Sequence, residues 1–261
     1  MGTAETNAKL WGARAREWAD HQEQTARPLY ENVLAATRIG AGSSYLDVGC
    51  GAGMALQLAA ALGAKVSGLD AAPDLLTIAR ERVPNGDIRQ GEIEELPFAD
   101  GTFDVVTGFN SFQYAAKPVE ALREAVRVTK KGGHVVIATW SPPDLTEAAK
   151  LIGAVRPLLP PPPPGAPGPF ALSDEAALTA LATEAGLTPV RTIDVDSPFT
   201  YPDLATALRG INSSGVSARA IAHSGEEAVT KAHEAVFVQY KRGDGSISVP
   251  NRFRYLLAMV G

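Results

Sequence analysis

The sequence predicts an α/β fold in which helices cover both faces of one mostly parallel β-sheet. Two observations support this. From residue 44 onwards, short apolar segments of strand type alternate with longer segments of helix type. The connections are short, and parallel strands joined in this way need right-handed crossovers over a face of the sheet. The carboxyl ends of the parallel strands are then expected to form the ligand-binding edge.

The expected elements follow in chain order. Two helices come first, at 7–22 and 28–37. Strands are expected at 44–48, 65–70, 88–91, 103–109, 134–139, 190–195 and 252–260. Helices are expected at 54–62, 73–82, 118–128, 144–155, 173–185, 202–210 and 226–240. Pro73 and Pro118 suit first helical turns, where the backbone N–H has no intrahelical partner.

A glycine-rich loop follows the first strand, in the sequence YLDVGCGAG of residues 45–53. Gly49, Gly51 and Gly53 allow backbone φ above zero and a close approach of the backbone to a ligand. The next helix starts near Gly53 and directs its free N–H groups at the loop. The segment is therefore predicted to hold a ligand.

The loop favours a cationic ligand over a dinucleotide. A dinucleotide fingerprint needs G-x-G-x-x-G, but Met54 stands where its third glycine would be. Asp47, just before the first glycine, repels a pyrophosphate and attracts a cation. S-adenosylmethionine carries a sulfonium and an ammonium and only one carboxylate, so it fits this loop better than NAD.

Later acids extend the expected site. Asp70 ends the second strand, where a carboxylate accepts hydrogen bonds from both ribose hydroxyls, and Ala71 follows it. The segment GEIEELPFADGTFD then places Glu92 and Ile93 at the end of the third strand, before turn residues. Asp70 suits NAD as well as S-adenosylmethionine, but NAD binding gives no account of this third segment.

Four segments in order, YLDVGCGAG, GLDAAPDLL, GEIEELPFADGTFDVV and KKGGHVVIATW, resemble the motifs of class I S-adenosylmethionine-dependent methyltransferases. The resemblance is strongest to the branch of the ubiquinone and menaquinone biosynthesis methylases. It implies a Rossmann-like fold with a seven-stranded sheet, whose last strand, 252–260, pairs antiparallel at the end of the sheet. It also implies S-adenosylmethionine as cofactor and S-adenosylhomocysteine as product.

The same resemblance assigns roles to residues. It implies that the loop 49–53 holds the methionine moiety, Asp70 the ribose, and Glu92 with the Ile93 backbone the adenine edge. The family more often has aspartate at the position of Glu92, so this chain extends that contact by one methylene. The full expected cofactor site comprises Trp18, Asp47, Gly49, Cys50, Gly51, Gly53, Met54, Asp70, Ala71, Glu92, Ile93, Phe109 and Asn110.

The first 40 residues are expected to form a helical lid. Trp11, Ala15 and Trp18 share one face of the helix expected at 7–22. This face either packs on the core or, as the resemblance implies, folds over the cofactor, where Trp18 excludes water. The cofactor-binding core then spans 44–140.

Two later segments are expected to surround the acceptor. Residues 141–172 form a proline-rich insertion, because the run from Pro160 to Pro164 cannot lie inside a helix or strand. This run is interpreted as extended surface chain, with a proline-binding partner as the alternative. The helices within 198–245 exceed a minimal fold and are interpreted as a cap. The whole chain is expected to be a single methyltransferase domain.

Composition limits the class of protein. The chain has 261 residues, a formal net charge of −5 and no basic block, which argues against a nucleic-acid partner. It has no apolar run of membrane-spanning length, and its single cysteine, Cys50, favours a reducing, cytoplasmic location. Its abundance of alanine, glycine and arginine is typical of bacteria. The sequence leaves the oligomeric state open.

Methyl transfer from a sulfonium needs positioning more than a catalytic triad. If a base is needed, candidates are His21, Tyr114, His223 and the neighbouring His233, though each is also compatible with a packed or surface role. A metal site is not expected. The acceptor is expected to be a small organic metabolite, methylated on O, N or C, in a pocket lined by Phe109, Phe112, Tyr114, Phe199 and Tyr201.

Alternatives stay open at this level. A protein of the same fold that uses S-adenosylmethionine without methyl transfer, as in a cyclase, needs the same loop and acids. A macromolecular acceptor is a second alternative. An NAD-dependent oxidoreductase is the third, and Met54 argues against it.

Overall fold

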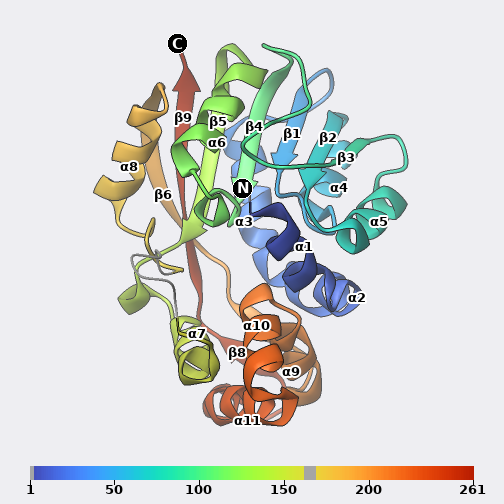
Figure 1. The fold of residues 1–261 in the computed structure, drawn as a ribbon, viewed down its shortest axis with the longest axis vertical. Coiled ribbons are helices and arrows are strands. Elements are labelled where there is room, and N and C mark those ends of the chain that lie inside the picture. The colour runs from blue at the N-terminus through green and yellow to red at the C-terminus, as the bar shows by residue number, and fades with distance from the viewer. Residues whose placement is uncertain (1–2, 162–168) are drawn as a thin grey trace.

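The computed structural model describes residues 3–161 and 169–261 of the chain. Its centre is a seven-stranded sheet in the order β3-β2-β1-β4-β5-β9-β6 (Figure 1). The strands of this sheet are β1 Ser44–Val48, β2 Lys65–Asp70, β3 Asp87–Gln90, β4 Phe103–Phe109, β5 Thr129–Trp140, β6 Leu187–Asp196 and β9 Arg252–Val260. A separate two-stranded sheet pairs β7 Phe199–Tyr201 with β8 Ile247–Val249.

The prediction of a mostly parallel sheet with an antiparallel last strand is confirmed, but the place of that strand was wrong. β9 runs antiparallel to both β5 and β6 and lies between them, so β6 forms the edge of the sheet. Tyr255, Leu256 and Ala258 of β9 are almost completely buried, because helices and the cap cover both faces of the sheet at this strand. An apolar strand of this kind is more stable inside a sheet than at its edge.

Helices cover both faces of the sheet. On one face α3, α4 and α5 pack on the sheet, and on the other α6 and α8 do so (Figure 1). The α-helices are α1 Ala4–Gly12, α2 Ala15–Glu17, α3 Arg27–Ala36, α4 Met54–Ala61, α5 Pro73–Arg82, α6 Pro118–Val128, α7 Ala149–Val155, α8 Glu175–Glu184, α9 Leu204–Asn212, α10 Gly215–Ser224 and α11 Glu226–Phe237. The chain builds the sheet outward from β1 in one direction and from β4 in the other, and the connecting helices lie on opposite faces in the two halves. A ligand is therefore expected at the carboxyl ends of β1 and β4, where the two halves meet.

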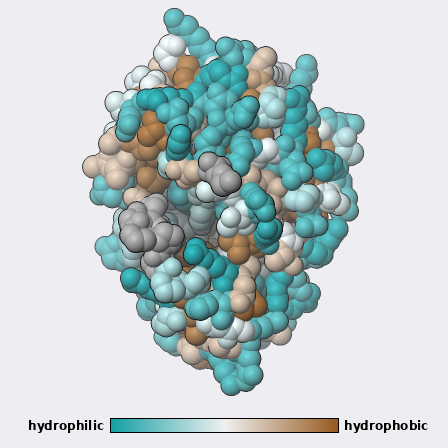
Figure 2. Space-filling view, viewed as in Figure 1, coloured by the Kyte–Doolittle hydropathy of each residue, from teal (hydrophilic) through white to brown (hydrophobic). Residues whose placement is uncertain are grey.

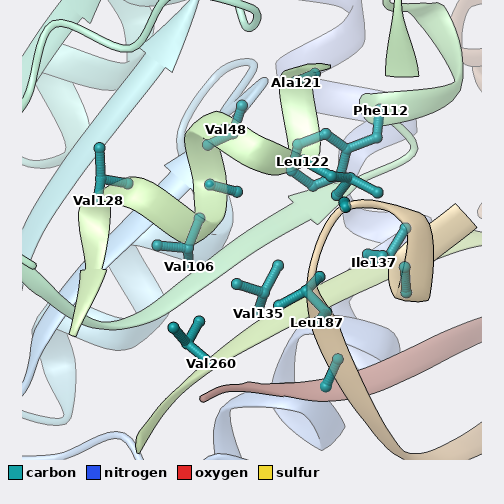
Figure 3. Packing of buried hydrophobic residues seen from close by; sticks show 14 of the residues in the cluster. Val48, Val106, Phe112, Ala121, Leu122, Val128, Val135, Ile137, Leu187 and Val260 are labelled. Carbon is teal, nitrogen blue, oxygen red and sulfur yellow. The ribbon is translucent and has the colours of Figure 1, made fainter. Parts of the chain in front are cut away.

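The largest core cluster lies between the sheet and the α6/α8 face. Figure 3 shows Val106 and Val135 of the strands packed beneath α6, which contributes Leu122 and Val128. All four are fully buried. This packing fixes the positions of β4 and β5, whose carboxyl ends lie at the ligand edge.

The first segment differs from the single helix expected at 7–22. It breaks after α1, where Arg14 has φ −139° and ψ 45°, and continues as α2, a π-helix at Trp18–Gln22 and a 3-10 helix at Glu23–Ala26. Trp11 packs on α10 while Trp18 lies at the glycine loop. We attribute the break to these two contacts, because the two tryptophans pack on different parts of the molecule. The periodicity of the sequence predicts one continuous helix and gives no sign of the break.

The segment beyond the carboxyl ends of the parallel strands forms a cap. Figure 1 shows α7, α9, α10, α11 and β8 gathered there, apart from the main sheet. The helices expected at 202–210 and 226–240 correspond to α9 and α11, which ends at Phe237 before a 3-10 turn at Val238–Tyr240. α10 was not expected, because its sequence GVSARAIAHS has no clear apolar stripe; Ser214 caps it by accepting a hydrogen bond from the backbone N–H of Ser217.

Other boundaries also needed correction. The strand expected at 134–139 begins already at Thr129 and ends at Trp140. The helix expected at 144–155 begins only at Ala149, after a 3-10 turn at Pro143–Leu145, and a further 3-10 turn follows at Arg156–Leu158. The expected strand at 190–195 extends over Leu187–Asp196. Most of the expected extended proline run, residues 162–168, lies outside the described residues.

The face of the molecule drawn in Figure 2 is mainly hydrophilic. On the face in Figure 2, hydrophobic residues are scattered among hydrophilic ones. Within the two described ranges, none of the helices has the length and apolar character that a membrane span requires.

Candidate functional site

One large cavity lies between the carboxyl ends of the strands, the N-terminal segment and the cap. We call the part near the glycine loop the loop end; its lining includes Trp11, Trp18, Glu23, Gly49, Gly51, Asp70, Ala71, Leu75, Gly91, Glu92, Ile93, Asn110 and Tyr114. We call the part beneath the cap the cap end; it is lined by Trp140, Ala148, Ile152, Pro169, Phe199, Ile211, Ser214, Val216 and Phe253. Tyr30 and Phe109 lie in the same lining and pack on each other, with ring centroids 4.6 Å apart.

The glycine loop has the backbone conformation that the sequence predicts. Gly49, Gly51 and Gly53 have φ of 77°, 54° and 84°, values that disfavour any residue with a Cβ. A Cβ on Gly49 would lie 2.4 Å from the Cβ of Ser111. The loop is held to β2, because the N–H groups of Gly49 and Cys50 both donate to the carbonyl of Leu69, over 2.7 and 3.0 Å.

Asp70 is fixed at the end of β2 by backbone donors. Its Oδ2 accepts from the N–H of Gly51 at 2.9 Å, and its Oδ1 accepts from the N–H of Ala72 at 2.9 Å. Burial raises the pKa of this carboxyl above its ordinary value, while the backbone donors oppose that effect. Each carboxylate oxygen has a second acceptor site, so Asp70 can receive two hydroxyl donors from a ligand without losing these bonds.

Glu92 and Ile93 lie directly after β3 and line the loop end. The Oε1 of Glu92 accepts a hydrogen bond from the N–H of Ala4 at 3.1 Å, which fixes the start of α1 over the cavity. Thr3 donates through Oγ1 to the carbonyl of Tyr114 at 2.9 Å. The N-terminal segment therefore lies across the loop end; its role as a lid stays a prediction.

Other residues expected at the site are placed next to it rather than in its lining. The Asp47 carboxylate lies under the loop and accepts from Thr107 Oγ1 at 2.8 Å, and burial raises the pKa of Asp47 to about 7. Cys50 is buried against Gly68 and Leu56, and Met54 packs on Tyr30. Gly53 packs on Ala79 of α5. These residues shape the loop, and a direct contact with a ligand stays a prediction.

The lid is held by aromatic packing and by ion pairs. Trp11 and Trp18 pack edge to face, with centroids 4.9 Å apart, and Trp11 lies 6.0 Å from Tyr114. Three ion pairs attach the lid to α11, α5 and α9: Arg14 with Glu226 at 2.7 Å, Arg16 with Glu81 at 3.1 Å, and Glu17 with Arg209 at 2.9 Å. Solvent and salt screen exposed pairs of this kind, so each contributes little to holding the lid.

Sequence reasoning missed Glu23, which belongs to the same lining. Its side chain is 3% exposed, forms an ion pair with Arg82 and accepts from the N–H of Met54 at 3.2 Å. Arg82 also donates to the carbonyls of Ala52 and Ala19, at 2.9 and 3.0 Å, so this pair joins the lid to the loop. Burial raises the pKa of Glu23, and Arg82 lowers it. No motif marks this residue, since its partners lie far along the chain.

Asn110 directly follows β4 and has a conformation that non-glycine residues rarely adopt, with φ of 51°. Its N–H donates to the carbonyl of Ala138 at 2.9 Å, and its Oδ1 accepts from Gln113 Nε2 at 3.0 Å. Such backbone strain is often kept where a side chain has to face a ligand.

The structure places only part of the expected aromatic pocket at the cavity. Phe109, Tyr114 and Phe199 line it. Phe112 is instead 1% exposed within the core. Tyr201 donates to Gln22 Oε1 at 2.7 Å and packs on Phe237. The sequence argument missed Trp140 and Phe253, which also line the cavity. They lie on β5 and β9, which are far apart in the sequence and become neighbours only in the sheet.

The candidate bases are dispersed. Burial raises the pKa of Tyr114 to about 12, so this hydroxyl stays protonated near neutral pH. His223 is exposed at the end of α10, and His21 packs toward Gly210 of α9. His233 is buried in the cap, where its Nδ1 lies 2.7 Å from Asn212 Oδ1 and burial lowers its pKa to about 4. Within residues 3–161 and 169–261, none of these histidines lines the cavity, and no group of three His, Cys, Asp or Glu side chains is placed to hold a metal ion.

Comparisons with known proteins agree with this geometry. A family profile described as a methyltransferase domain matches residues 46–137. A malonyl-[acyl-carrier protein] O-methyltransferase of Erwinia pyrifoliae is 31% identical over 213 residues, 80% of this chain and 76% of that protein. A demethylmenaquinone methyltransferase of Renibacterium salmoninarum is 38% identical over 112 residues, 42% of this chain and 47% of that protein.

A solved structure supports the fold. The crystal structure of a proposed methyltransferase from Bacillus halodurans aligns with a TM-score of 0.59 at 18% identity, over 88% of this chain and 97% of that chain. Together these findings define the class: the chain has the Rossmann-like class I methyltransferase fold. It belongs to the S-adenosylmethionine-dependent methyltransferases and is an enzyme of that family.

The residues at the loop end fit the family's cofactor. A Cβ on Gly51 would point toward Trp18 Nε1 and Glu23 Oε1, at 3.8 and 3.9 Å, so the missing side chain leaves room for a ligand between the lid and the loop. The charged side chains here are Glu23, Asp70 and Glu92. Such a set favours a ligand that carries positive charge and hydroxyl groups.

Proposed function

We propose that this enzyme binds S-adenosylmethionine at the loop end and transfers its methyl group to a small organic molecule at the cap end. The observation that supports this most directly is the continuity of the cavity, whose lining runs from Gly49 and Asp70 to Ile152 and Phe253. One molecule at each end would lie in a common space. Reacting atoms held in this way gain up to about 7–11 kcal/mol from orientation.

The expected cofactor contacts follow from the donors and acceptors at the loop end. Asp70 accepts from the ribose hydroxyls, and Gly49 and Gly51 admit the methionine moiety against their backbone. Ile93 and Leu75 supply apolar surface for the adenine. When bound, S-adenosylmethionine supplies a methyl group on a sulfonium, a strong leaving group that departs as neutral S-adenosylhomocysteine.

The chain's own part is to orient the acceptor and to exclude water. Trp11, Trp18 and Tyr30 close the loop end with apolar surface. Among the described residues of the cap end, no carboxylate, histidine or lysine is present to take a proton. A proton lost by an O–H or N–H acceptor would therefore pass to bulk solvent and not to a side chain of the cap end.

The relatives do not agree on an acceptor. One acts on malonyl-acyl carrier protein and the other on demethylmenaquinone. Their names support methyl transfer by this chain, and the atom methylated remains open among O, N and C. A cytoplasmic location stays an expectation from the sequence.

Calorimetric titration with S-adenosylmethionine, S-adenosylhomocysteine and NAD tests the cofactor, and mass spectrometry of incubated acceptors tests the transfer. We expect the first two ligands to bind and NAD not to bind. Asp70→Ala should weaken S-adenosylmethionine by about tenfold or more, since a hydrogen bond to a charged group contributes about 1.5–3 kcal/mol. Asp87→Ala, at the exposed start of β3, is the matched control.

Two outcomes would count against the proposal. An unchanged dissociation constant in Asp70→Ala would remove the ribose assignment. Binding of S-adenosylmethionine without a methylene gain in any acceptor tried would favour the cyclase-type alternative.

A further inference from the structure

We propose that the acceptor of this enzyme is an uncharged aromatic or otherwise apolar molecule, and that the cap end excludes carboxylates and phosphates. This inference rests on the proposed function, because it names the substrate class of the same site. It is supported by the wall of the cap end, the places of the nearby cations and the charge of the loop end.

The wall of the cap end is an aromatic cluster. Trp140, Phe199 and Phe253 come from β5, β7 and β9, and the ring centroid of Trp140 lies 5.0 Å from that of Phe253 and 6.2 Å from that of Phe199. Phe199 and Phe253 are 2% and 3% exposed, so the core holds them in place. Trp140 is only partly buried, so in this cluster it is the ring that presents flat apolar surface on which an aromatic ligand can stack.

The cap helices close this end with aliphatic side chains. Ile152, Ile211 and Val216 come from α7, α9 and α10, and each lines the cavity. On the cap helices the polar lining residue is Ser214, whose Oγ lies 2.9 Å from Ser217 Oγ and accepts from the backbone N–H of Ser217. Gln22 and Thr25 of the N-terminal segment also line the cavity, and both are uncharged. The cap therefore supplies apolar contact and no ionic partner.

Cations next to this wall are directed elsewhere. Arg252 and Arg254 flank Phe253 in β9, and since side chains alternate along a strand they point away from it. They pair with Asp196 and Asp194, at 2.7 and 2.8 Å. In α7, Lys150 is 57% exposed and pairs with Glu147 at 2.5 Å.

No lysine, arginine or histidine is found among the described residues that line the cavity. Residues 162–168, which are not described, consist of proline, glycine and alanine, so the sequence allows no cation there either. The ionised groups of the lining are the acids Glu23, Asp70 and Glu92 at the loop end. An anionic acceptor would leave water without a cationic side chain to pair with and would face these carboxylates, and both effects oppose its binding in the absence of the sulfonium.

The test uses matched pairs of probes on the full chain: 2-naphthol with 2-naphthoate, 1-naphthol with 1-naphthoate, and 4-hydroxybiphenyl with biphenyl-4-carboxylate. Calorimetry at pH 7 gives each dissociation constant, with and without saturating S-adenosylhomocysteine. We expect the neutral member of each pair to bind at least about tenfold more tightly. An equal or tighter carboxylate overturns the proposal, and so does a failure of all neutral probes to bind.

A charge variant sharpens the test. Ile152→Arg should improve carboxylate binding by about tenfold, because a cation then faces the cap end. Ile152→Met keeps the volume and the neutral character and should leave the ratio within each pair unchanged. If Ile152→Arg fails to fold by circular dichroism, Val216→Arg on α10 replaces it. A carboxylate affinity that responds to neither arginine would show that the probes bind outside the cap end, and would overturn the proposal.

This result can be separated from the proposed function. Titrations without cofactor measure the preference of the cap end alone. If neutral probes are preferred but S-adenosylmethionine does not bind, the proposed function fails while the inference about the cap end stands. If S-adenosylmethionine binds and carboxylates are preferred, only the inference fails.

Discussion

At the residue scale, three buried or partly buried carboxylates lie around the glycine loop. Asp47 and Glu23 are 2% and 3% exposed, Asp70 is only partly exposed, and Arg82 is the cation paired with this group. Each of these carboxyls has a pKa raised by burial, and Asp47 is also affected by the charges of the other two. A ligand that brings positive charge would relieve this mutual repulsion.

The pKa of Asp47 predicts a pH dependence of stability. It is raised to about 7, and its ordinary value in an unfolded chain is about 3.9. Between these pH values the folded chain retains a proton that the unfolded chain has lost. The free energy of unfolding should therefore fall as pH rises from about 4 to about 7, and then level off.

Urea unfolding of the ligand-free enzyme at pH 5 and pH 8 measures this change, and Asp47→Asn is the control that should reduce it. Binding of S-adenosylmethionine near pH 6.5 should release protons, since a nearby cation lowers the pKa of these acids. Calorimetry in two buffers detects the release. S-adenosylhomocysteine, which has no sulfonium, should release fewer protons, and an equal release would contradict the charge argument.

The left-handed backbone of Asn110 predicts a trade between stability and activity. Asn110→Gly should raise stability by up to about 1 kcal/mol, because glycine adopts φ of this sign without strain. It should also lower methyl transfer if the side chain faces a ligand. Arg38, with φ 55°, is exposed beyond α3, so Arg38→Gly is a matched control. Thermal unfolding measures the stability of the two variants, and initial rates measure their methyl transfer. Equal rates in Asn110→Gly and Arg38→Gly would mean that Asn110 is not part of the site.

At the scale of elements, the lid depends on a close contact between α1 and α10. A Cβ on Gly215 would lie 2.7 Å from the Trp11 ring, so this glycine is what allows the two helices to meet. Trp11 in turn packs on Trp18, which faces the glycine loop. The lid is thus attached to the cap as well as to the core.

Gly215→Ala should displace Trp11 and weaken S-adenosylmethionine binding by roughly three- to tenfold, which corresponds to about 0.6–1.4 kcal/mol. Gly153→Ala in α7 is the control, because a Cβ there meets nothing within 4 Å and should slightly stabilise the helix. Titration and tryptophan fluorescence measure the effect. Equal affinity in both variants would mean that the contact of α1 with α10 does not hold the lid.

At the scale of the whole molecule, the cavity lies where three parts meet: the sheet, the N-terminal segment and the cap. A ligand that contacts more than one part should stabilise all of them together. At a concentration 100 times the dissociation constant, S-adenosylmethionine should add about 2.7 kcal/mol. For a chain of this size that corresponds to an increase in Tm of about 5–10 °C.

A thermal scan with each ligand checks this expectation. S-adenosylhomocysteine should raise Tm in the same way, and NAD should leave it unchanged. A shift with NAD alone would overturn the cofactor assignment.

The strand–helix alternation, the glycine loop and Asp70 were accessible from sequence because they are local. Each depends on residues a few positions apart, such as Gly49 and Gly51, whose backbone conformation follows from having no Cβ. Glu23, Trp140 and Phe253 were not accessible, because nothing near them in sequence marks them as site residues.

The sequence by itself determined the α/β class, the loop with its positive φ and the family. These features depend on periodicity and on short motifs, which act over one or two elements. Only the tertiary structure decided that β9 lies inside the sheet, that the helix expected at 7–22 breaks into shorter helices, and that Glu23 meets Arg82. Those outcomes depend on contacts between residues far apart in the chain, where burial and packing override local preference.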